Sequence, residues 1–484
     1  MTRVSECVKI PAASGDPSAT PLRRRQTLLC LALLLTAYAV GLCRQIDEPW
    51  IRIHDWNGAF YSQLARNALR YPFDIHHGMP LVAVGENAAP QDRSIYATHP
   101  AGLVWVIAAA FKLFGENEFA ARLTAIVASL LSLSLLFDLL RRWIGLPMAL
   151  LAGFVYAIMP LNVFFGRMVN HEPFCMAAML CALWCWQTLE TPPTPRTHRL
   201  SHLAGFALAV FFCAAIDWPG FLFAALFSLY AAYAWRRNRI SGGLCAFVWA
   251  TTTFACAAVT LHIVYAGLNG SWHSLWSIFT ARTGSGADDQ IIVGNAWTHT
   301  IENASLVAII FSLIGLTGLC FRRFRHLVPI DRLPAAMVLL ATGVLWVALF
   351  WRQYRIHNYW GFYLGPTFAI LTALGFSIVR MISVRFGRIA SDGLLVISLL
   401  LAIVAGQRHS DLFFNSILCP PEYVSAWKRM HDRTPKGVIV QLPWNPIRAE
   451  RFGEYIYRNI TPPQMAWYLD RPFEVAPQSS QPAQ

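Results

Sequence analysis

The residues of this sequence that could do chemistry gather in four short segments, each combining ionisable and aromatic side chains or lying in a polar loop. The first carries His54 and Asp55 and leads on to His99, which precedes a proline. A carboxylate there can take a proton from a hydroxyl or amine acceptor, and an imidazole can help to stabilise a departing phosphate. Trp50 and Trp56 flank the pair, and tryptophan is typical of membrane–water interfaces. The first segment therefore indicates acid–base chemistry close to a membrane surface.

The second segment runs from Gly166 to Pro173 and places a carboxylate beside apolar stretches of the chain. It contains Arg167 and Glu172. A carboxylate next to membrane helices costs free energy, so it normally forms an ion pair or has a function. A catalytic role for Glu172 and a plain ion pair with Arg167 both stay open.

The third and fourth segments supply cations. Arg282 lies in a loop rich in glycine and aspartate, and the fourth segment contains Arg355, His357 and Tyr359. Guanidinium groups at the edge of a bilayer bind phosphate oxygens, and cations stabilise negative charge on a departing phosphate. An interfacial belt would explain the aromatic residues without any function.

Transmembrane helices must position these segments, because the chain lacks a polar surface. Hydrophobic residues make up 56% of its 484 residues and charged residues 13%, against roughly 25% charged in soluble proteins. A span needs roughly 17–25 apolar residues. We therefore expect an all-α polytopic membrane protein of about eleven spans, at 27–43, 119–140, 146–165, 174–190, 201–216, 219–235, 243–266, 303–321, 333–350, 361–380 and 391–407.

Arginine clusters between the spans indicate the orientation. The net charge of +13 comes from short clusters in the loops, which is the positive-inside pattern and not a nucleic-acid surface. With eleven spans every cluster is cytoplasmic, provided that Pro100 to Phe114 is an interfacial helix and not a span. The clusters are Arg23–Arg25, Arg141–Arg142, Arg196–Arg199, Arg236–Arg239, Arg322–Arg325 and Arg380–Arg388.

This topology divides the chain into three parts. We expect a cytoplasmic tail at 1–26, a transmembrane catalytic domain at 27–407 and an external segment at 408–484. The catalytic domain has a large first external loop at 44–118. We expect the external segment to form a small α/β appendage, with a helix at 422–433 and strands at 437–442 and 468–472.

A metal site and a nucleotide site have weak support in the sequence. The eleven cysteines are scattered and lack zinc-ligand spacing, and there is no P-loop or dinucleotide-binding glycine motif. His99, Glu86 and Asp92 could form a ligand set for a divalent metal ion, which leaves metal dependence open.

The order of these segments resembles the GT-C glycosyltransferases that use polyprenyl-phosphate sugars, a group that contains protein O-mannosyltransferases and lipid A aminoarabinose transferases. The resemblance covers roughly residues 27–380. It rests on the acidic first loop with Ala65-Arg66-Asn67, His99-Pro100, Phe114-Gly115 with Ala121-Arg122-Leu123, Gly166-Arg167-Met168 with Glu172-Pro173, and Arg355 to Trp360.

The resemblance implies a catalytic carboxylate in the first loop. We assign it to Asp55 with His54 beside it, while Asp47 stays an alternative because the family's acidic pair would align nearer Asn57-Gly58. Glu172 is the acidic residue before Pro173, and related members often have the sequence Asp-Met-Pro at this place. Arg122 and Arg282 match positions where the resemblance suggests phosphate or acceptor contacts.

The expected function is therefore sugar transfer from a polyprenyl-phosphate donor to a lipid, glycan or protein acceptor, with no nucleic-acid partner. The expected location is a multi-pass position in a bacterial inner membrane, with the site facing the periplasm or exterior. A transporter or flippase of a lipid-linked or anionic substrate is the main alternative, and a lipid-linked polymer ligase is the second. A transporter would need ionisable groups near mid-membrane and broken helices.

Overall fold

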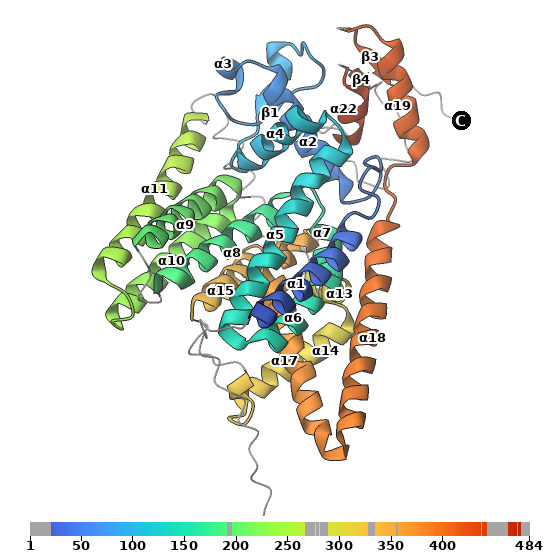
Figure 1. Ribbon diagram of the computed structural model, residues 1–484. Coiled ribbons are helices and arrows are strands. Elements are labelled where there is room, and N and C mark those ends of the chain that lie inside the picture. The colour runs from blue at the N-terminus through green and yellow to red at the C-terminus, as the bar shows by residue number, and fades with distance from the viewer. Residues whose placement is uncertain are drawn as a thin grey trace, which may run out of the picture.

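Helices form most of the part of the protein that the structure describes (Figure 1). The computed structural model describes residues 21–190, 196–266, 276, 280, 289–327, 334–354, 357–436, 438–442, 463–471 and 473–475. A helix overlies each of the eleven predicted spans. These helices are α1 (Pro21–Leu42), α5 (Glu118–Ile144), α6 (Leu146–Ile158), α8 (His171–Glu190), α9 (Arg196–Ile216), α10 (Trp218–Arg236), α11 (Gly242–Ala266), α14 (Leu306–Cys320), α15 (Pro334–Leu349), α17 (Gly365–Ser383) and α18 (Arg388–Phe414).

The helices differ in length, and two of the expected spans are broken. Within the described residues, seven helices are long and apolar enough to cross a membrane, and an eighth span results if α14 is joined to α13 (Asp289–Ala304), from which it is bent by 95°. The expected span at 146–165 consists of α6 and α7 (Pro160–Phe165), because Pro160 lacks the N–H that would continue α6. The multi-pass helical architecture is confirmed, and the count of eleven stays a prediction.

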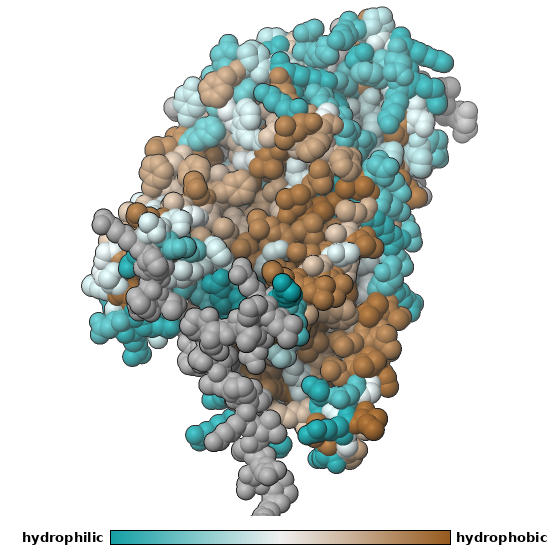
Figure 2. All heavy atoms as spheres, in the orientation of Figure 1, coloured by the Kyte–Doolittle hydropathy of each residue, from teal (hydrophilic) through white to brown (hydrophobic). Residues whose placement is uncertain are grey.

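An apolar band crosses the middle of the face that Figure 2 shows. Figure 2 shows hydrophobic side chains in a band between two hydrophilic ends. Helix α18 contributes exposed side chains to this surface, among them Val396, Ile397, Leu400, Leu401 and Val404. Apolar groups left outside the helix bundle in such numbers are suited to contact with lipid chains.

Small residues allow α14 and α17 to pack closely. A side chain at Gly375 would collide with the carbonyl of Phe311, and one at Gly315 with the carbonyl of Leu371. Since apolar side chains gain nothing by leaving lipid for protein, close backbone approach is a main source of helix association in membranes. The two glycines therefore fix this helix pair.

The first loop folds into a cap on one end of the bundle (Figure 1). It contains α2 (Asp55–Arg70), α3 (Phe73–His76), α4 (Gly102–Phe114) and the antiparallel strands β1 (Leu81–Val82) and β2 (Ser94–Ile95). Helix α4 has 13 residues, fewer than a span requires, and packs on α2. It ends at Gly115, whose φ of +83° lies in a region open mainly to glycine.

The C-terminal segment packs on the same cap. It contains α19 (Pro421–Arg433), α22 (Pro463–Leu469) and the parallel strands β3 (Val440–Leu442) and β4 (Phe473–Val475). The predicted helix at 422–433 is confirmed. The predicted strand at 468–472 is wrong, because Tyr468 and Leu469 belong to α22, Asp470 and Arg471 are not in a strand, and β4 begins only at Phe473. Every residue of α22 is buried, and a short apolar run in such surroundings does not reveal by periodicity whether it is helix or strand.

Arg66 joins the cap to the C-terminal segment. Its guanidinium is buried, donates to Glu116 Oε2 at 2.9 Å and to the carbonyl of Trp467 at 2.9 Å, and lies 3.5 Å above the Trp467 ring. Asp470 completes the network through an ion pair with Arg70 at 2.8 Å. Arg66, part of the motif that carried the family resemblance, therefore has a structural role.

Replacing Arg66 with alanine is expected to loosen the C-terminal segment from the cap. Removing one partner of a buried ion pair costs about 3–5 kcal/mol, so thermal unfolding should occur at a lower temperature and protease should release the segment sooner. Lys436→Ala is the control, because its pair with Glu86 is exposed and such pairs contribute about 0–1 kcal/mol. Equal melting temperatures for the two variants would contradict the assignment.

Candidate functional site

A cleft lies where the first loop meets α5 and the turn between α7 and α8. Three arginines, one carboxylate and one imidazole contribute to its wall, together with apolar side chains. We call it the arginine cleft. Its lining residues are Trp50, Arg52, His54, Asp55, Gly58, Arg122, Phe164, Arg167, Met168 and Val169.

Asp55 occupies a fixed position at the start of α2. One carboxylate oxygen accepts hydrogen bonds from the backbone N–H groups of Ile51 at 3.1 Å and Arg52 at 3.0 Å, and the other lies 3.3 Å from Arg122 Nη2. An acidic side chain in the first helical turn also interacts favourably with the helix dipole. Asp55 thus orients both the chain before α2 and the guanidinium of Arg122.

The guanidinium groups of Arg122 and Arg167 are wrapped by the first loop. Arg122 is 1% exposed, donates to the carbonyls of Ile46 (3.0 Å) and Glu48, and lies 4.1 Å from the Trp50 ring centre. Arg167 donates to the carbonyls of Gln45 (2.7 Å) and Arg44. Burial and the neighbouring Arg122 lower the pKa of Arg167, although a guanidinium keeps its charge at neutral pH.

The charge of the arginine cleft is therefore positive. Arg52, Arg122 and Arg167 face Asp55 and Glu48, and Glu48 pairs with Arg52. Three cations against two carboxylates favour an additional anion, and planar guanidinium groups bind phosphate oxygens well.

His54 contributes a neutral imidazole to the arginine cleft. Aromatic rings approach it from several sides, with centres at 5.0 Å for Phe165, 5.7 Å for Phe164 and 6.2 Å for Tyr359. Part of the side chain still reaches solvent, yet removal of water by these rings lowers the pKa of His54 to about 4. His54 is uncharged at neutral pH.

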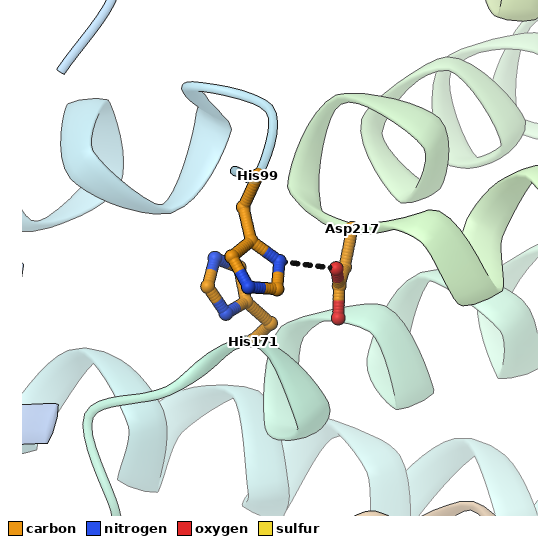
Figure 3. A group of neighbouring side chains, drawn as sticks. All are labelled: His99, His171 and Asp217. Atoms are coloured by element: carbon orange, nitrogen blue, oxygen red, sulfur yellow. Dashed lines mark hydrogen bonds and ion pairs between the residues drawn. The ribbon is translucent and has the colours of Figure 1, made fainter. Parts of the chain in front are cut away.

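His99, His171 and Asp217 form a second cluster of ionisable groups (Figure 3). His99 precedes α4, His171 is the first residue of α8, and Asp217 lies between α9 and α10. His99 Nδ1 lies 2.7 Å from Asp217 Oδ1, and the rings of the two histidines stack with centres 4.3 Å apart. We call these three residues the histidine–aspartate group.

Glu172 is buried beside the histidine–aspartate group. It is 1% exposed, and Asp217 is near enough to act on its carboxylate electrostatically. Its Oε2 has no hydrogen-bond partner within the described part of the chain. The ion pair with Arg167 that the sequence left open does not form, because Arg167 donates to first-loop carbonyls instead.

Tyrosine rings connect the two clusters. The Tyr359 ring meets His54 in the arginine cleft, and its hydroxyl lies 2.5 Å from His357 Nδ1. Tyr61 meets His171 edge-on at 4.8 Å and is close enough to Tyr359 for electrostatic interaction. The arginine cleft and the histidine–aspartate group therefore belong to one continuous polar region.

The structure brings most of the predicted site residues into this region. The arginine cleft contains His54, Asp55, Arg122 and Arg167. The histidine–aspartate group contains His99 and adjoins Glu172. Tyr359 lies between the two clusters, and His357 contacts its hydroxyl. Arg282 and Arg355 lie outside the described residues.

The ligand set of His99, Glu86 and Asp92 is wrong. Glu86 pairs with Lys436 and Asp92 is exposed, and neither joins His99 in the group that geometry allows to hold a metal among the described residues. Asp47, the alternative base, is exposed and does not line the arginine cleft.

The sequence prediction missed Arg52, Tyr61 and Asp217 as members of the site. The sequence does contain a sign that Asp217 belongs to the site. A carboxylate in a very short turn between two apolar helices is expected to form an ion pair or to have a function. Its partner His99 is 118 residues away, and only the packing of the helices brings the two together.

Two comparisons relate this geometry to known proteins. The model of the family described as dolichyl-phosphate-mannose-protein mannosyltransferase matches residues 98–212, which include His99, Arg122, Arg167 and Glu172. The crystal structure of ArnT from Cupriavidus metallidurans bound to undecaprenyl phosphate superposes with a TM-score of 0.60 at 14% identity, over 94% of this chain and 86% of ArnT. This chain has the GT-C glycosyltransferase fold.

A second solved structure has a similar fold. The archaeal oligosaccharyltransferase AglB from Archaeoglobus fulgidus, in complex with an inhibitory peptide and a dolichol-phosphate, gives a TM-score of 0.58 at 14% identity, over 94% of this chain and 65% of AglB. Comparison with curated protein sequences found no match. The predicted resemblance to GT-C glycosyltransferases is confirmed by the fold and by the partial match of the family model.

The lowered pKa of His54 predicts a pH effect on stability. The pKa falls from its ordinary 6.5 to about 4 on folding, so the unfolded chain binds more protons between these values, and stability is lost as pH falls from 6.5 toward 4. The melting temperature of His54→Phe in detergent should therefore drop less between pH 7.5 and pH 5 than that of the wild type. His198→Gln, at an exposed position, should leave the drop unchanged. An equal drop in all three proteins would refute the shift.

Proposed function

We propose that this protein transfers a sugar from a polyprenyl-phosphate carrier to an acceptor hydroxyl or amine, with inversion at the sugar carbon. The observation that carries the proposal is the arginine cleft, which combines three guanidinium groups with a fixed carboxylate at one end of an apolar bundle. The acceptor belongs to the class of lipids, glycans or proteins of the cell envelope.

The arginines suit the leaving phosphate. As the bond from sugar to phosphate breaks, negative charge grows on the phosphate oxygens, and guanidinium groups already held in place stabilise that charge without reorganisation. Arg122 and Arg167 are held by backbone carbonyls. The solved relatives support the donor class, since ArnT was crystallised with undecaprenyl phosphate and AglB with a dolichol-phosphate.

Asp55 is the proposed general base. It shares the arginine cleft with the guanidinium groups, so an acceptor bound there would lie near both the carboxylate and the sugar phosphate. His54 beside it is uncharged at neutral pH and can accept a hydrogen bond without adding charge. Glu172 lies with the second cluster, and its role is to bind or activate the acceptor from that side.

The site would face the non-cytoplasmic side of the membrane, and in a bacterium the periplasm. The loop that joins α17 to α18 contains Arg385 and lies at the end of the molecule opposite α2 (Figure 1). Arginine-rich loops remain cytoplasmic, so the first loop and residues 408–484 would be external. Eleven spans satisfy this arrangement.

The transporter alternative is less well supported. It requires broken helices, and these are present between α6 and α7 and between α13 and α14. It also requires ionisable groups near mid-membrane, whereas the cations described above are gathered with the first loop at one end of the bundle. The fold favours the transferase.

Transfer from a synthetic polyprenyl-phosphate sugar tests the mechanism. Asp55→Asn should lower kcat by about 10²- to 10⁴-fold, as loss of a general base does, and Glu172→Gln should also lower turnover. Asp138→Asn is the control, because Asp138 pairs with Arg141 and Arg142 near the far end of α5. If both Asp55→Asn and Glu172→Gln turn over the donor as fast as the wild type, the proposed mechanism is wrong.

A further inference from the structure

The histidine–aspartate group brings three metal-ligating side chains together from distant parts of the chain. One ligand atom from each of His99, His171 and Asp217 can be chosen so that all three lie within 4.8 Å of one another. Figure 3 shows both imidazole rings and the carboxylate converging from three separate elements. Zinc bonds of about 2.1 Å in tetrahedral geometry place ligand atoms roughly 3.4 Å apart, so small side-chain movements suffice.

Neighbouring groups orient two of these ligands. Asn170 Oδ1 lies 3.0 Å from His171 Nδ1, and since a carbonyl oxygen only accepts, Nδ1 carries the proton and Nε2 carries the lone pair. Asp217 Oδ1 accepts from the Trp218 N–H at 2.8 Å at the start of α10. Metal-binding histidines and carboxylates are commonly held by such second contacts.

The charge of the surroundings also favours a cation. Asp217 is 2% exposed and Glu172 is 1% exposed, and they interact electrostatically. Burial of a carboxylate costs free energy unless opposite charge or hydrogen bonds compensate it. One oxygen of Glu172 has no hydrogen-bond partner in the described part of the chain. A divalent ion on Asp217 would compensate both carboxylates.

We propose that His99, His171 and Asp217 bind a divalent transition-metal ion, for which Zn²⁺ is the best fit, with Glu172 beside it as a compensating carboxylate. Two imidazole nitrogens and one carboxylate oxygen are the ligands of many zinc sites, which leave a position open for an oxygen ligand. Magnesium and calcium prefer sites made of oxygen ligands. The inference rests on ligand geometry and charge and does not depend on the proposed transferase activity.

Metal binding by the full-length protein tests the proposal directly. The protein is purified in detergent with a tag that lacks histidine, stripped with a chelator, and titrated with Zn²⁺ and separately with Mg²⁺ by calorimetry. We expect one Zn²⁺ per chain and no comparable Mg²⁺ binding. Binding should weaken as pH falls below about 6.5, because histidine ligands must be unprotonated.

Variants locate the ion. His171→Ala and Asp217→Asn should each weaken Zn²⁺ binding by at least about tenfold. Asparagine can still accept the hydrogen bond from Trp218, so Asp217→Asn removes the negative charge and keeps the cap of α10. The melting temperature of each variant shows whether it folds. His262→Gln is the matched control, since His262 contacts the carbonyl of His77 and is not in the group.

Three outcomes would overturn the site. These are no Zn²⁺ binding by the wild type, unchanged affinity in the folded Asp217→Asn variant, and binding that depends on His262 and not on His171. Because none of these readouts measures sugar transfer, a failure of the metal site and a failure of the transferase mechanism remain distinguishable.

Discussion

The hydrogen bonds that hold the buried guanidinium groups of Arg122 and Arg167 are the interaction on which the rest of the site depends. A buried cation needs hydrogen-bond acceptors or opposite charge, and the carbonyls of the first loop supply them. That requirement fixes the path of residues 44–48. It also sets where α2 begins, because Asp55 pairs with Arg122 while capping the backbone before the helix. Trp50 then covers the Arg122 guanidinium.

The polar region separates charge of opposite sign. The arginine cleft holds an excess of cations, and the second cluster holds the buried carboxylates of Asp217 and Glu172. Tyr359 contacts the arginine cleft through His54, and Tyr61 contacts the second cluster through His171. In the proposed transfer, the arginines would bind the donor phosphate, Asp55 would take the proton of the acceptor in the arginine cleft, and Glu172 would act on the acceptor from the second cluster.

The sequence predicts the membrane architecture well because span length and arginine placement are local properties. All eleven expected spans coincide with helices, and three of the four segments that lie outside the spans supply most of the site residues. Prediction fails where distant segments determine the outcome. The pairing of His99 with Asp217 arises from helix packing. Tyr468 becomes helical because α22 is buried on the cap. The helix break before Pro160 differs from these cases, because it has a local cause that the sequence shows, namely the proline.

The most direct test of the account is the affinity for a polyprenyl phosphate that carries no sugar, measured for the wild type and for Arg167→Gln. Hydrogen bonds to charged groups contribute about 1.5–3 kcal/mol, so Arg167→Gln should bind roughly 10- to 150-fold more weakly. Arg141→Gln, on the solvent-accessible last turn of α5, should bind like the wild type. Equal affinity in the folded Arg167→Gln variant would contradict the assignment of the arginine cleft to the phosphate.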